Sequence, residues 1–175
     1  MTANYIYEKL NTIKYGWVDK NKKQHIKLEP ALFSEIYMLQ NPEELIDSKI
    51  GVCWDQVELE RYYFSKTNLK CNSYVIMYID KKKMPNHTFL VYEDNNKYYW
   101  FEHAWDKYKG MHEFNDLKSL LIQVKEKFIT DELKGICNID SLFIFNYSKP
   151  EIHLDCASFY KHMMSGKNIT SIIKE

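Results

Sequence analysis

Glycine and proline are scarce in this sequence, with five glycines and four prolines among 175 residues. Such a low content argues against a disordered or low-complexity chain. Large side chains are plentiful instead, because 14 tyrosines, nine phenylalanines and four tryptophans can fill a core and line pockets. A chain of this length can bury one core but is short for two. We therefore expect one domain over residues 1–175, with a helical segment at 1–41 and a core at about 42–147.

The sequence also lacks an excess of either charge, since Lys plus Arg and Asp plus Glu each total 24. Nothing draws the chain to nucleic acid or to an anionic membrane, and we expect neither as a partner. No apolar run approaches the roughly 18 residues of a membrane-spanning helix. Charged residues also interrupt any signal-peptide segment near the start: Glu8, Lys9, Lys14 and Asp19. The chain is therefore predicted to be cytoplasmic.

Cysteines are few, and none of the four belongs to a CxxC pair. In a reducing compartment we expect all of them to be free thiols, with structural roles for Cys71 and Cys137. The other two, Cys53 and Cys156, each stand at the start of a helical pattern. Cys156 directly follows Asp155, whose negative charge disfavours a thiolate, and no strand histidine is obviously placed to serve it. Cys53 is thus the stronger candidate for a reactive thiol.

Cys53 lies in the segment Gly51-Val52-Cys53-Trp54-Asp55-Gln56, where a glycine turn runs into a helical pattern that extends to about Lys66. A thiol at the first turn lies on the positive end of the helix dipole, which stabilises the thiolate and favours nucleophilic chemistry. An isolated cysteine on a helix is more often a small buried hydrophobic residue. The position therefore permits catalysis, and further residues are needed to indicate it.

The first half of the chain is predicted to be mainly helical. A weak helical pattern covers residues 3–13, and residues 15–18 form a short extended piece before a charged turn. Pro30 is suited to the first turn of a helix, where its missing N–H is harmless. Asn41 as cap and Pro42 as first residue signal a second helix directly afterwards.

The middle of the chain carries three strand patterns. Residues 73–79 are β-branched and aromatic and apolar on both faces, which is typical of a central strand. Two further patterns, at about 87–93 and 98–105, flank a polar turn at 94–97. Asparagine tolerates positive φ, so Asn95-Asn96 is expected to form a two-residue hairpin loop.

The register of that hairpin selects a partner for a histidine. A two-residue loop places Phe89 opposite Glu102 and His87 opposite Ala104, so Glu102 shares a sheet face with His87. The diagonal separation is about 7–8 Å, within side-chain reach. His103 then points to the opposite face, although a loop longer by one residue would bring it to the face of His87 instead.

Beyond the hairpin, the sequence predicts more helices around the sheet. Apolar residues recur at helical spacing over 117–128 behind Asn115 or Asp116 as cap, and residues 142–147 form another strand. Asp155 can cap a last helix that ends near Gly166. The fold class expected is α+β, with an antiparallel sheet packed against the helix of Cys53 and additional helices.

Taken together, these residues resemble the transglutaminase-like superfamily, within the papain-like cysteine fold. The resemblance covers about residues 42–106 and rests on Gly51-Val52-Cys53-Trp54, on His87 opening a strand and on Glu102 in the next strand. The family's usual acid is Asp, followed by a short apolar or proline segment, whereas Glu102-His103-Ala104-Trp105 stands here. Asp106 is the reserve candidate for the acid.

The resemblance implies a Cys53, His87, Glu102 triad that acts without a cofactor. The activity it implies is that of an amide or acyl hydrolase or acyltransferase, of protease, deamidase or transglutaminase type, acting on a peptide, protein or small amide. Trp54 and Trp105 are the expected substrate-binding residues, although aromatic residues at such spacing more often belong to a core.

Three alternatives remain open at this stage. The chain could be a catalytically silent module of the same family that binds a peptide or protein. An arylamine-acetyltransferase-like enzyme uses the same residue types, but this chain is short for that family. A zinc site could be assembled from His87, His103, His112 and Cys53, yet no compact ligand pair such as HExxH supports it. The sequence does not indicate an oligomeric state.

Overall fold

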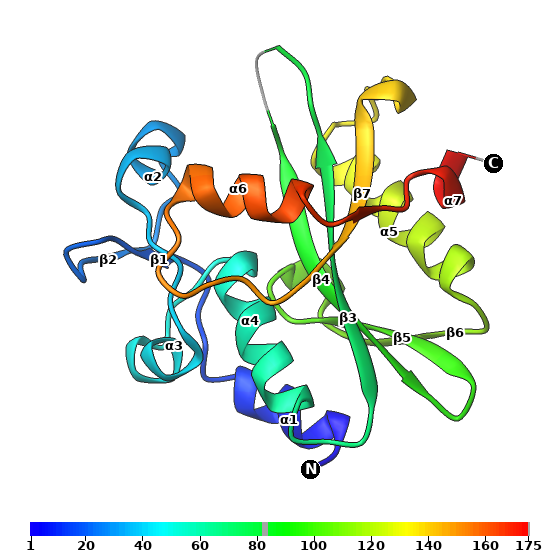
Figure 1. Cartoon of the computed structure of the whole chain (residues 1–175), viewed down its shortest axis with the longest axis horizontal. Helices are drawn as coiled ribbons and strands as arrows, with labels where there is room; N and C mark the ends of the chain where they lie inside the picture. Colours follow the sequence, from blue (N-terminus) through cyan, green and yellow to red (C-terminus); the bar gives the residue numbers. More distant parts are fainter. Residues whose placement is uncertain (82–83, 175) are drawn as a thin grey trace.

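The computed structural model of the chain describes residues 1–81 and 84–174. Within them the chain adopts an α+β fold with seven α-helices, a six-stranded antiparallel sheet and a two-stranded sheet (Figure 1). The helices are α1 (Ala3–Leu10), α2 (Pro30–Ile36), α3 (Pro42–Ser48), α4 (Cys53–Phe64), α5 (Leu117–Asp131), α6 (Cys156–Met164) and α7 (Ser171–Lys174). The small sheet pairs β1 (Trp17–Val18) with β2 (Gln24–His25).

The large sheet has the strand order β6-β5-β4-β3-β7-β8. Its strands are β3 (Lys70–Tyr78), β4 (Asn86–Asp94), β5 (Lys97–Glu102), β6 (Gly110–Phe114), β7 (Leu142–Tyr147) and β8 (Lys167–Asn168). Neighbouring strands are antiparallel throughout. The apolar strand β3 lies between β4 and β7, which confirms its prediction as a central strand.

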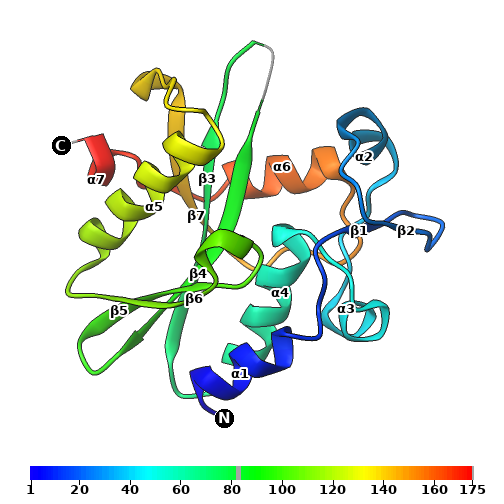
Figure 2. The same ribbon diagram turned by 180° about the vertical axis from the view of Figure 1, so that it is seen from behind.

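Helices cover both faces of this sheet (Figures 1 and 2). On one face α4 packs against β3 and β4, and Val57 of α4 shares a core with Val75 and Met77 of β3. On the other face α5 buries Leu121 and Phe128 against the strands. The expected packing of the helix of Cys53 on an antiparallel sheet is confirmed, and burial from both sides explains why β3 is apolar on both faces.

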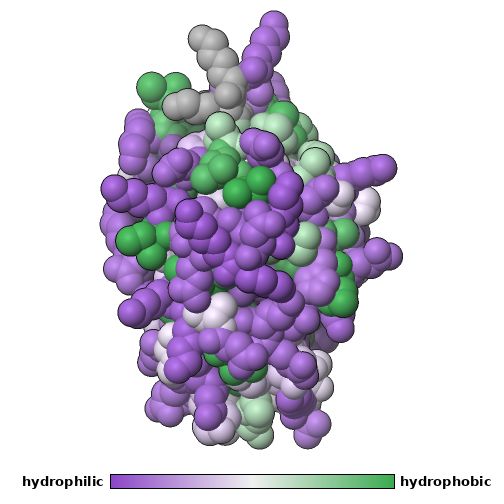
Figure 3. Space-filling model, turned by 90° about the vertical axis from the view of Figure 1, so that its left-hand side faces the viewer, coloured by the Kyte–Doolittle hydropathy of each residue, from purple (hydrophilic) through white to green (hydrophobic). Residues whose placement is uncertain are grey.

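The helix starts expected in the first half of the chain are confirmed. Pro30 and Pro42 each occupy the first turn of their helix. Asn41 and Glu44 form a reciprocal capping box, in which each side chain accepts a hydrogen bond from the other residue's backbone N–H. The face of the molecule that carries α2, α3 and the two-stranded sheet is predominantly hydrophilic (Figure 3).

The β4–β5 hairpin has the expected loop. Asn95 and Asn96 have φ values of 49° and 60°, as a two-residue type I′ turn requires. The register runs from Asp94 opposite Lys97 to Leu90 opposite Phe101. This register is the one predicted from a two-residue loop, and the ladder ends one pair before Glu102.

Several sequence-based boundaries were wrong. The third strand pattern stops at Glu102 instead of continuing to about 105, because the Glu102 carboxylate accepts a hydrogen bond from the Trp105 N–H and the chain turns into a 3-10 helix. Strand β6 was missed, since none of its five residues is buried and they give no clear alternation. The helix capped by Asp155 ends at Met164 and is followed by β8 and α7, so it is not the last.

Across residues 1–81 and 84–174, no helix is both long enough and apolar enough to cross a membrane. The sequence also predicts a solvated basic turn at Lys81-Lys82-Lys83, of which Lys82 and Lys83 lie outside the described residues.

Candidate active site

Cys53 is the first residue of α4, and only 6% of it is exposed. Gly51 makes this helix start possible, because a Cβ atom there would lie 2.7 Å from Leu45 Cδ1 and 2.8 Å from Asp55 Cβ. The Val52 N–H donates to the Asp55 carboxylate at 3.1 Å, which holds the first turn closed. The thiol therefore lies at the N-terminal, positive end of a 12-residue helix.

His87 and Glu102 are brought together by the β4–β5 register. The imidazole Nε2 and the carboxylate Oε2 are 2.7 Å apart, and both side chains are buried. The same carboxylate accepts hydrogen bonds from Trp100 Nε1 at 3.2 Å and from the Trp105 backbone N–H at 2.7 Å. Glu102 is thus fixed by three donors and occupies the Nε2 position of His87.

The pKa of His87 reflects these contacts. Burial alone would lower it, but the charge of Glu102 and hydrogen bonds with Cys53 and Glu102 prevail and raise it to about 10. His87 is therefore an imidazolium at neutral pH, paired with a carboxylate on one side and next to a thiol on the other. This is the electrostatic setting in which a cysteine acts as a nucleophile.

Asp106, the reserve candidate for the acid, lies in an exposed turn away from His87. Its side chain is 93% exposed and pairs with Lys109 at 2.9 Å in the turn after β5. A strand continued past Glu102 would have kept Asp106 near the sheet, but the chain turns away before reaching it. Of the two carboxylates considered from the sequence, Glu102 alone contacts His87.

His103 points to the face opposite His87, as the preferred register predicted. Its Nδ1 lies 2.7 Å from Gln56 Oε1, and Gln56 Nε2 donates to the Gly51 carbonyl at 2.9 Å. Because an amide oxygen only accepts, Nδ1 carries the proton, and burial lowers the pKa of His103 to about 4. This neutral histidine therefore ties the end of β5 to the turn that precedes Cys53.

The two tryptophans expected to bind substrate differ in exposure. Trp54 is 3% exposed, and aromatic rings surround its indole: Phe33, Tyr37, Phe159 and Tyr160. It belongs to the core and lines no open groove in this structure, so that assignment has no structural support. Trp105 is half-buried, with its ring centroid 4.7 Å from that of His87. Of the two tryptophans, Trp105 is the one whose ring packs against the imidazole.

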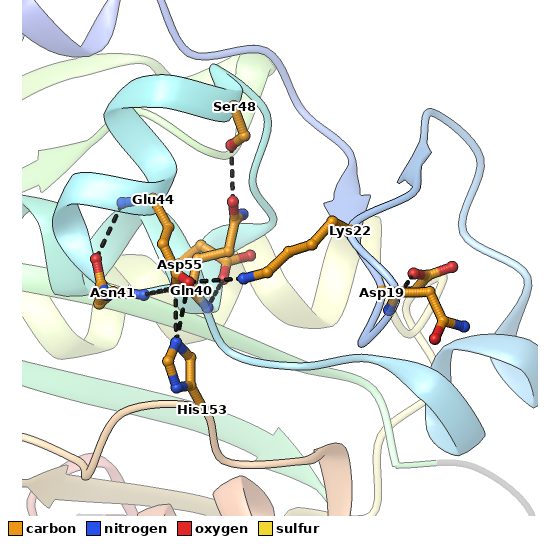
Figure 4. A network of polar contacts seen from close by, with 9 residues as sticks. Asp19, Lys22, Gln40, Asn41, Glu44, Ser48, Asp55 and His153 are labelled. Atoms are coloured by element: carbon orange, nitrogen blue, oxygen red, sulfur yellow. Dashed lines mark hydrogen bonds and ion pairs between the residues drawn. The ribbon is translucent and has the colours of Figure 1, made fainter.

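Asp55, two residues after Cys53, anchors the helix start to the preceding loop. Tyr37 Oη and the Gln40 N–H both donate to its Oδ1 at 3.0 Å. Gln40 in turn accepts from Ser48 Oγ, so the loop and α3 join the same network (Figure 4). Burial raises the pKa of Asp55 to about 7, while the donated hydrogen bonds oppose that rise.

The remaining thiols are less suited to catalysis. All four cysteines are free. Burial and the adjacent Asp155 raise the pKa of Cys156 to about 11, which keeps it a thiol. Burial also raises the pKa of Cys71 and Cys137. The rival position at the start of α6 therefore lacks an activating environment, in line with the sequence-based reason for setting it aside.

The start of α4 presents backbone amides next to Cys53. The first N–H groups of a helix have no intrahelical partner, and those of Cys53 and Trp54 belong to the first turn of α4. Nearby side-chain donors are already bonded, with Gln40 Nε2 on the Ile50 carbonyl and Gln56 Nε2 on the Gly51 carbonyl.

The four residues considered for zinc do not converge. His103 faces Gln56, and His112 Nε2 bonds the Tyr108 carbonyl at 2.7 Å. Among residues 1–81 and 84–174, no group of three or more His, Cys, Asp or Glu side chains is arranged to hold a metal ion.

One buried acid near the site was missed by sequence reasoning. Glu60 of α4 is 1% exposed, and its Oε2 has no hydrogen-bond partner among the described residues. Burial and the neighbouring charge of Glu102 raise its pKa well above the usual value. The folded state thus favours the protonated form of Glu60, and helical periodicity gave no signal because a charged residue was not expected inside the core.

Glu60→Gln is expected to stabilise the protein at pH 8 relative to wild type and to have little effect at pH 4. The folded state holds the Glu60 proton to a higher pH than the unfolded chain, which loses it as the pH rises through about 4.5. Wild-type stability therefore falls with rising pH through this group, and glutamine removes the dependence. Urea unfolding at both pH values measures the difference, with the exposed Glu126→Gln as control. A loss of stability in Glu60→Gln at pH 8 would show that the carboxylate is ionised and paired.

The fold and site together define a class of arrangement: a cysteine at a helix N-terminus, next to a strand histidine that is held by a carboxylate on the neighbouring strand. No protein-family model matches the chain, and no curated protein gives a significant match. Any function assigned to this protein therefore rests on the geometry of Cys53, His87 and Glu102.

Proposed function

We propose that this protein is a cysteine-nucleophile hydrolase or acyltransferase that acts on amide or related acyl groups through Cys53, His87 and Glu102. The observation that carries the proposal is the line of contacts from thiol to imidazole to carboxylate. Cys53 is close enough to His87 to help raise the pKa of the imidazole, and His87 Nε2 lies 2.7 Å from Glu102 Oε2. Burial of all three groups strengthens their electrostatic coupling.

Each residue has one role in the reaction. Because His87 is an imidazolium, it already holds the proton of the Cys53 thiol, and the thiolate attacks the carbonyl carbon of an amide. Glu102 holds the imidazole in one orientation and stabilises the imidazolium. The backbone N–H groups of Cys53 and Trp54 stabilise the oxyanion, an effect worth about 10²–10³ in rate. When the C–N bond breaks, His87 protonates the departing amine and a thioester remains on Cys53.

The thioester is then released by a second nucleophile. Water yields a carboxylic acid, and an amine yields a new amide; in both cases His87 accepts the nucleophile's proton and returns one to the thiol. Both outcomes belong to the proposal, so it covers protease, deamidase and transglutaminase chemistry. The transglutaminase-like or papain-like form of the fold is part of this proposal, supported by α4 packed on an antiparallel sheet and by the order of the three residues.

A second candidate is a silent module of the same class that binds a peptide or protein. One observation favours it: Cys53 is 6% exposed, and the two cavities described, of about 370 and 170 Å³, are lined by residues other than Cys53, His87 and Glu102. A covered thiol in an otherwise ordered triad is what such a module would present. The intact hydrogen bonding of His87 favours the enzyme.

Substoichiometric iodoacetamide at pH 6 tests the proposal. An ordinary thiol with a pKa of about 8.5 is roughly 0.3% ionised at this pH, so a thiolate paired with an imidazolium gains up to about 300-fold in concentration. Lower intrinsic nucleophilicity of such a thiolate offsets part of the gain, and we expect a net preference of roughly tenfold for Cys53. Peptide mass spectrometry identifies the modified cysteine, with Cys53→Ser as the control for background labelling.

Two results would count against the proposal. Equal labelling of all four cysteines would mean that Cys53 is not activated. Labelling confined to the half-buried Cys71 or Cys137 would mean that exposure alone governs reactivity, which is the behaviour of the silent module.

A further inference from the structure

Asn86, the residue directly before His87, contacts the residue directly after Cys53. Its Oδ1 accepts a hydrogen bond from Trp54 Nε1 at 2.8 Å. Its Nδ2 donates to Tyr160 Oη at 2.6 Å and to the Met84 carbonyl at 3.2 Å. One amide group thus joins α4, the start of β4 and α6.

The orientation of this amide is determined by its partners. An indole N–H can only donate and a backbone carbonyl can only accept, so Oδ1 must face Trp54 and the NH₂ group must face Met84. Tyr160 reinforces the arrangement, because its hydroxyl also donates to the Met84 carbonyl at 3.2 Å and its ring packs edge-on against Trp54 at 5.0 Å. Asparagine satisfies every partner, whereas leucine or alanine satisfies none.

We infer that Asn86 is a positioning residue that sets the approach of His87 to Cys53. Asn86 bonds Trp54 and Tyr160, whereas His87, the next residue of the strand, bonds Glu102. The Trp54–Asn86 hydrogen bond lies one residue away from the proposed reacting pair in each segment, since Trp54 follows Cys53 and Asn86 precedes His87. It therefore holds the helix start and the strand at the separation that a Cys53–His87 hydrogen bond needs. This role rests on the proposed function.

The pH profile of Cys53 alkylation tests the role. In Asn86→Ala we expect the rate at pH 6 to fall by roughly tenfold, less than the 10²-fold that a displacement of about 1 Å can cost. The profile should shift toward that of an ordinary thiol, with reactivity recovered at high pH. Tyr160→Phe keeps the Trp54–Asn86 bond and is expected to lose less, so it remains informative even if the alanine variant folds poorly.

Asn146→Ala is the matched control. Asn146 is also a half-buried strand asparagine, and its Nδ2 donates to the Ser73 carbonyl at 3.1 Å, between β7 and β3. Both alanine variants remove side-chain amide bonds within the sheet region, so thermal unfolding should shift in the same direction in both. Only Asn86→Ala is expected to change the alkylation profile.

An unchanged profile in Asn86→Ala, in a wild type whose Cys53 reacts selectively, would overturn the positioning role and leave the proposed function standing. An equal change in Asn146→Ala would also overturn it, because the effect would then follow stability. A wild-type Cys53 that reacts no faster than the other thiols would remove the proposed function and this role with it.

Discussion

His87→Ala is expected to slow the alkylation of Cys53 at pH 6 by at least about tenfold. The imidazolium beside the thiol is what favours the thiolate, since the charge of Glu102 and hydrogen bonding raise the pKa of His87 to about 10. Without His87, Cys53 retains only the helix dipole, a contribution of about 0.3–1 kcal/mol. The rate of iodoacetamide incorporation at Cys53, followed from pH 5 to 9, measures the effect.

The same substitution is expected to destabilise the fold by about 3–5 kcal/mol, because it leaves Glu102 buried without its charged partner. The His87→Ala, Glu102→Ala double variant should recover part of that stability, since no unpaired carboxylate remains, but it should not recover Cys53 reactivity. Urea unfolding of the two single variants and the double variant gives the coupling energy. Recovery of both quantities in the double variant would contradict a chemical role for His87.

Wild-type stability should also depend on pH through His87. The folded-state pKa of about 10 lies above the ordinary value of 6.5, so the stabilisation is fully present below pH 6.5 and is lost as the pH rises toward 10. In both variants that lack His87 this contribution to the pH dependence is absent, which gives the unfolding experiment a second readout.

Gly51→Ala is expected to displace the start of α4 and to reduce both stability and Cys53 reactivity. The added methyl group would lie 2.7 Å from Leu45 Cδ1 and 2.8 Å from Asp55 Cβ, distances that require a shift of one or both. Overpacking of this kind costs about 1–3 kcal/mol. Because Asp55 holds the first turn through the Val52 N–H, a shift of Asp55 also moves Cys53. Urea unfolding and the alkylation rate at pH 6 report the two effects.

Gly135→Ala serves as the comparison for Gly51→Ala. Gly135 has a φ of 78° and open space around its Cα, so alanine there costs about 1–2 kcal/mol of backbone strain without a clash. It follows α5, on the other side of the sheet from α4. Alkylation of Cys53 should be unaffected by it. Normal Cys53 reactivity in Gly51→Ala would show that the glycine serves stability alone.

Much of the site's framework follows from local sequence. Asn95 and Asn96 adopt the positive φ values that a two-residue hairpin loop needs, and the loop length alone then places Glu102 on the face of His87. Gly51 and Asp55 likewise signal the start of α4 at Cys53. These features were predictable because turns and helix starts depend on the conformations and backbone groups of residues a few positions apart.

Other parts of the site could not be predicted in this way. Trp54 was expected to line a groove, but four aromatic rings enclose it. They belong to Phe33 of α2, to Tyr37 directly after α2, and to Phe159 and Tyr160 of α6. Asn86 gave no signal, because its partner Tyr160 lies 74 positions further along the chain. The buried Glu60 broke the rule that charged residues stay at the surface.

The sequence by itself determined where α4 starts, where the hairpin turns and which acid can meet His87. The tertiary structure alone decided that Trp54 is enclosed, that Asn86 joins α4 to β4 and α6, and that Cys53 is covered. The physical reason is the sequence separation of the groups that interact. Turns and caps are settled by neighbouring backbone groups, whereas burial and side-chain hydrogen bonds depend on segments that meet only when helices pack on the completed sheet.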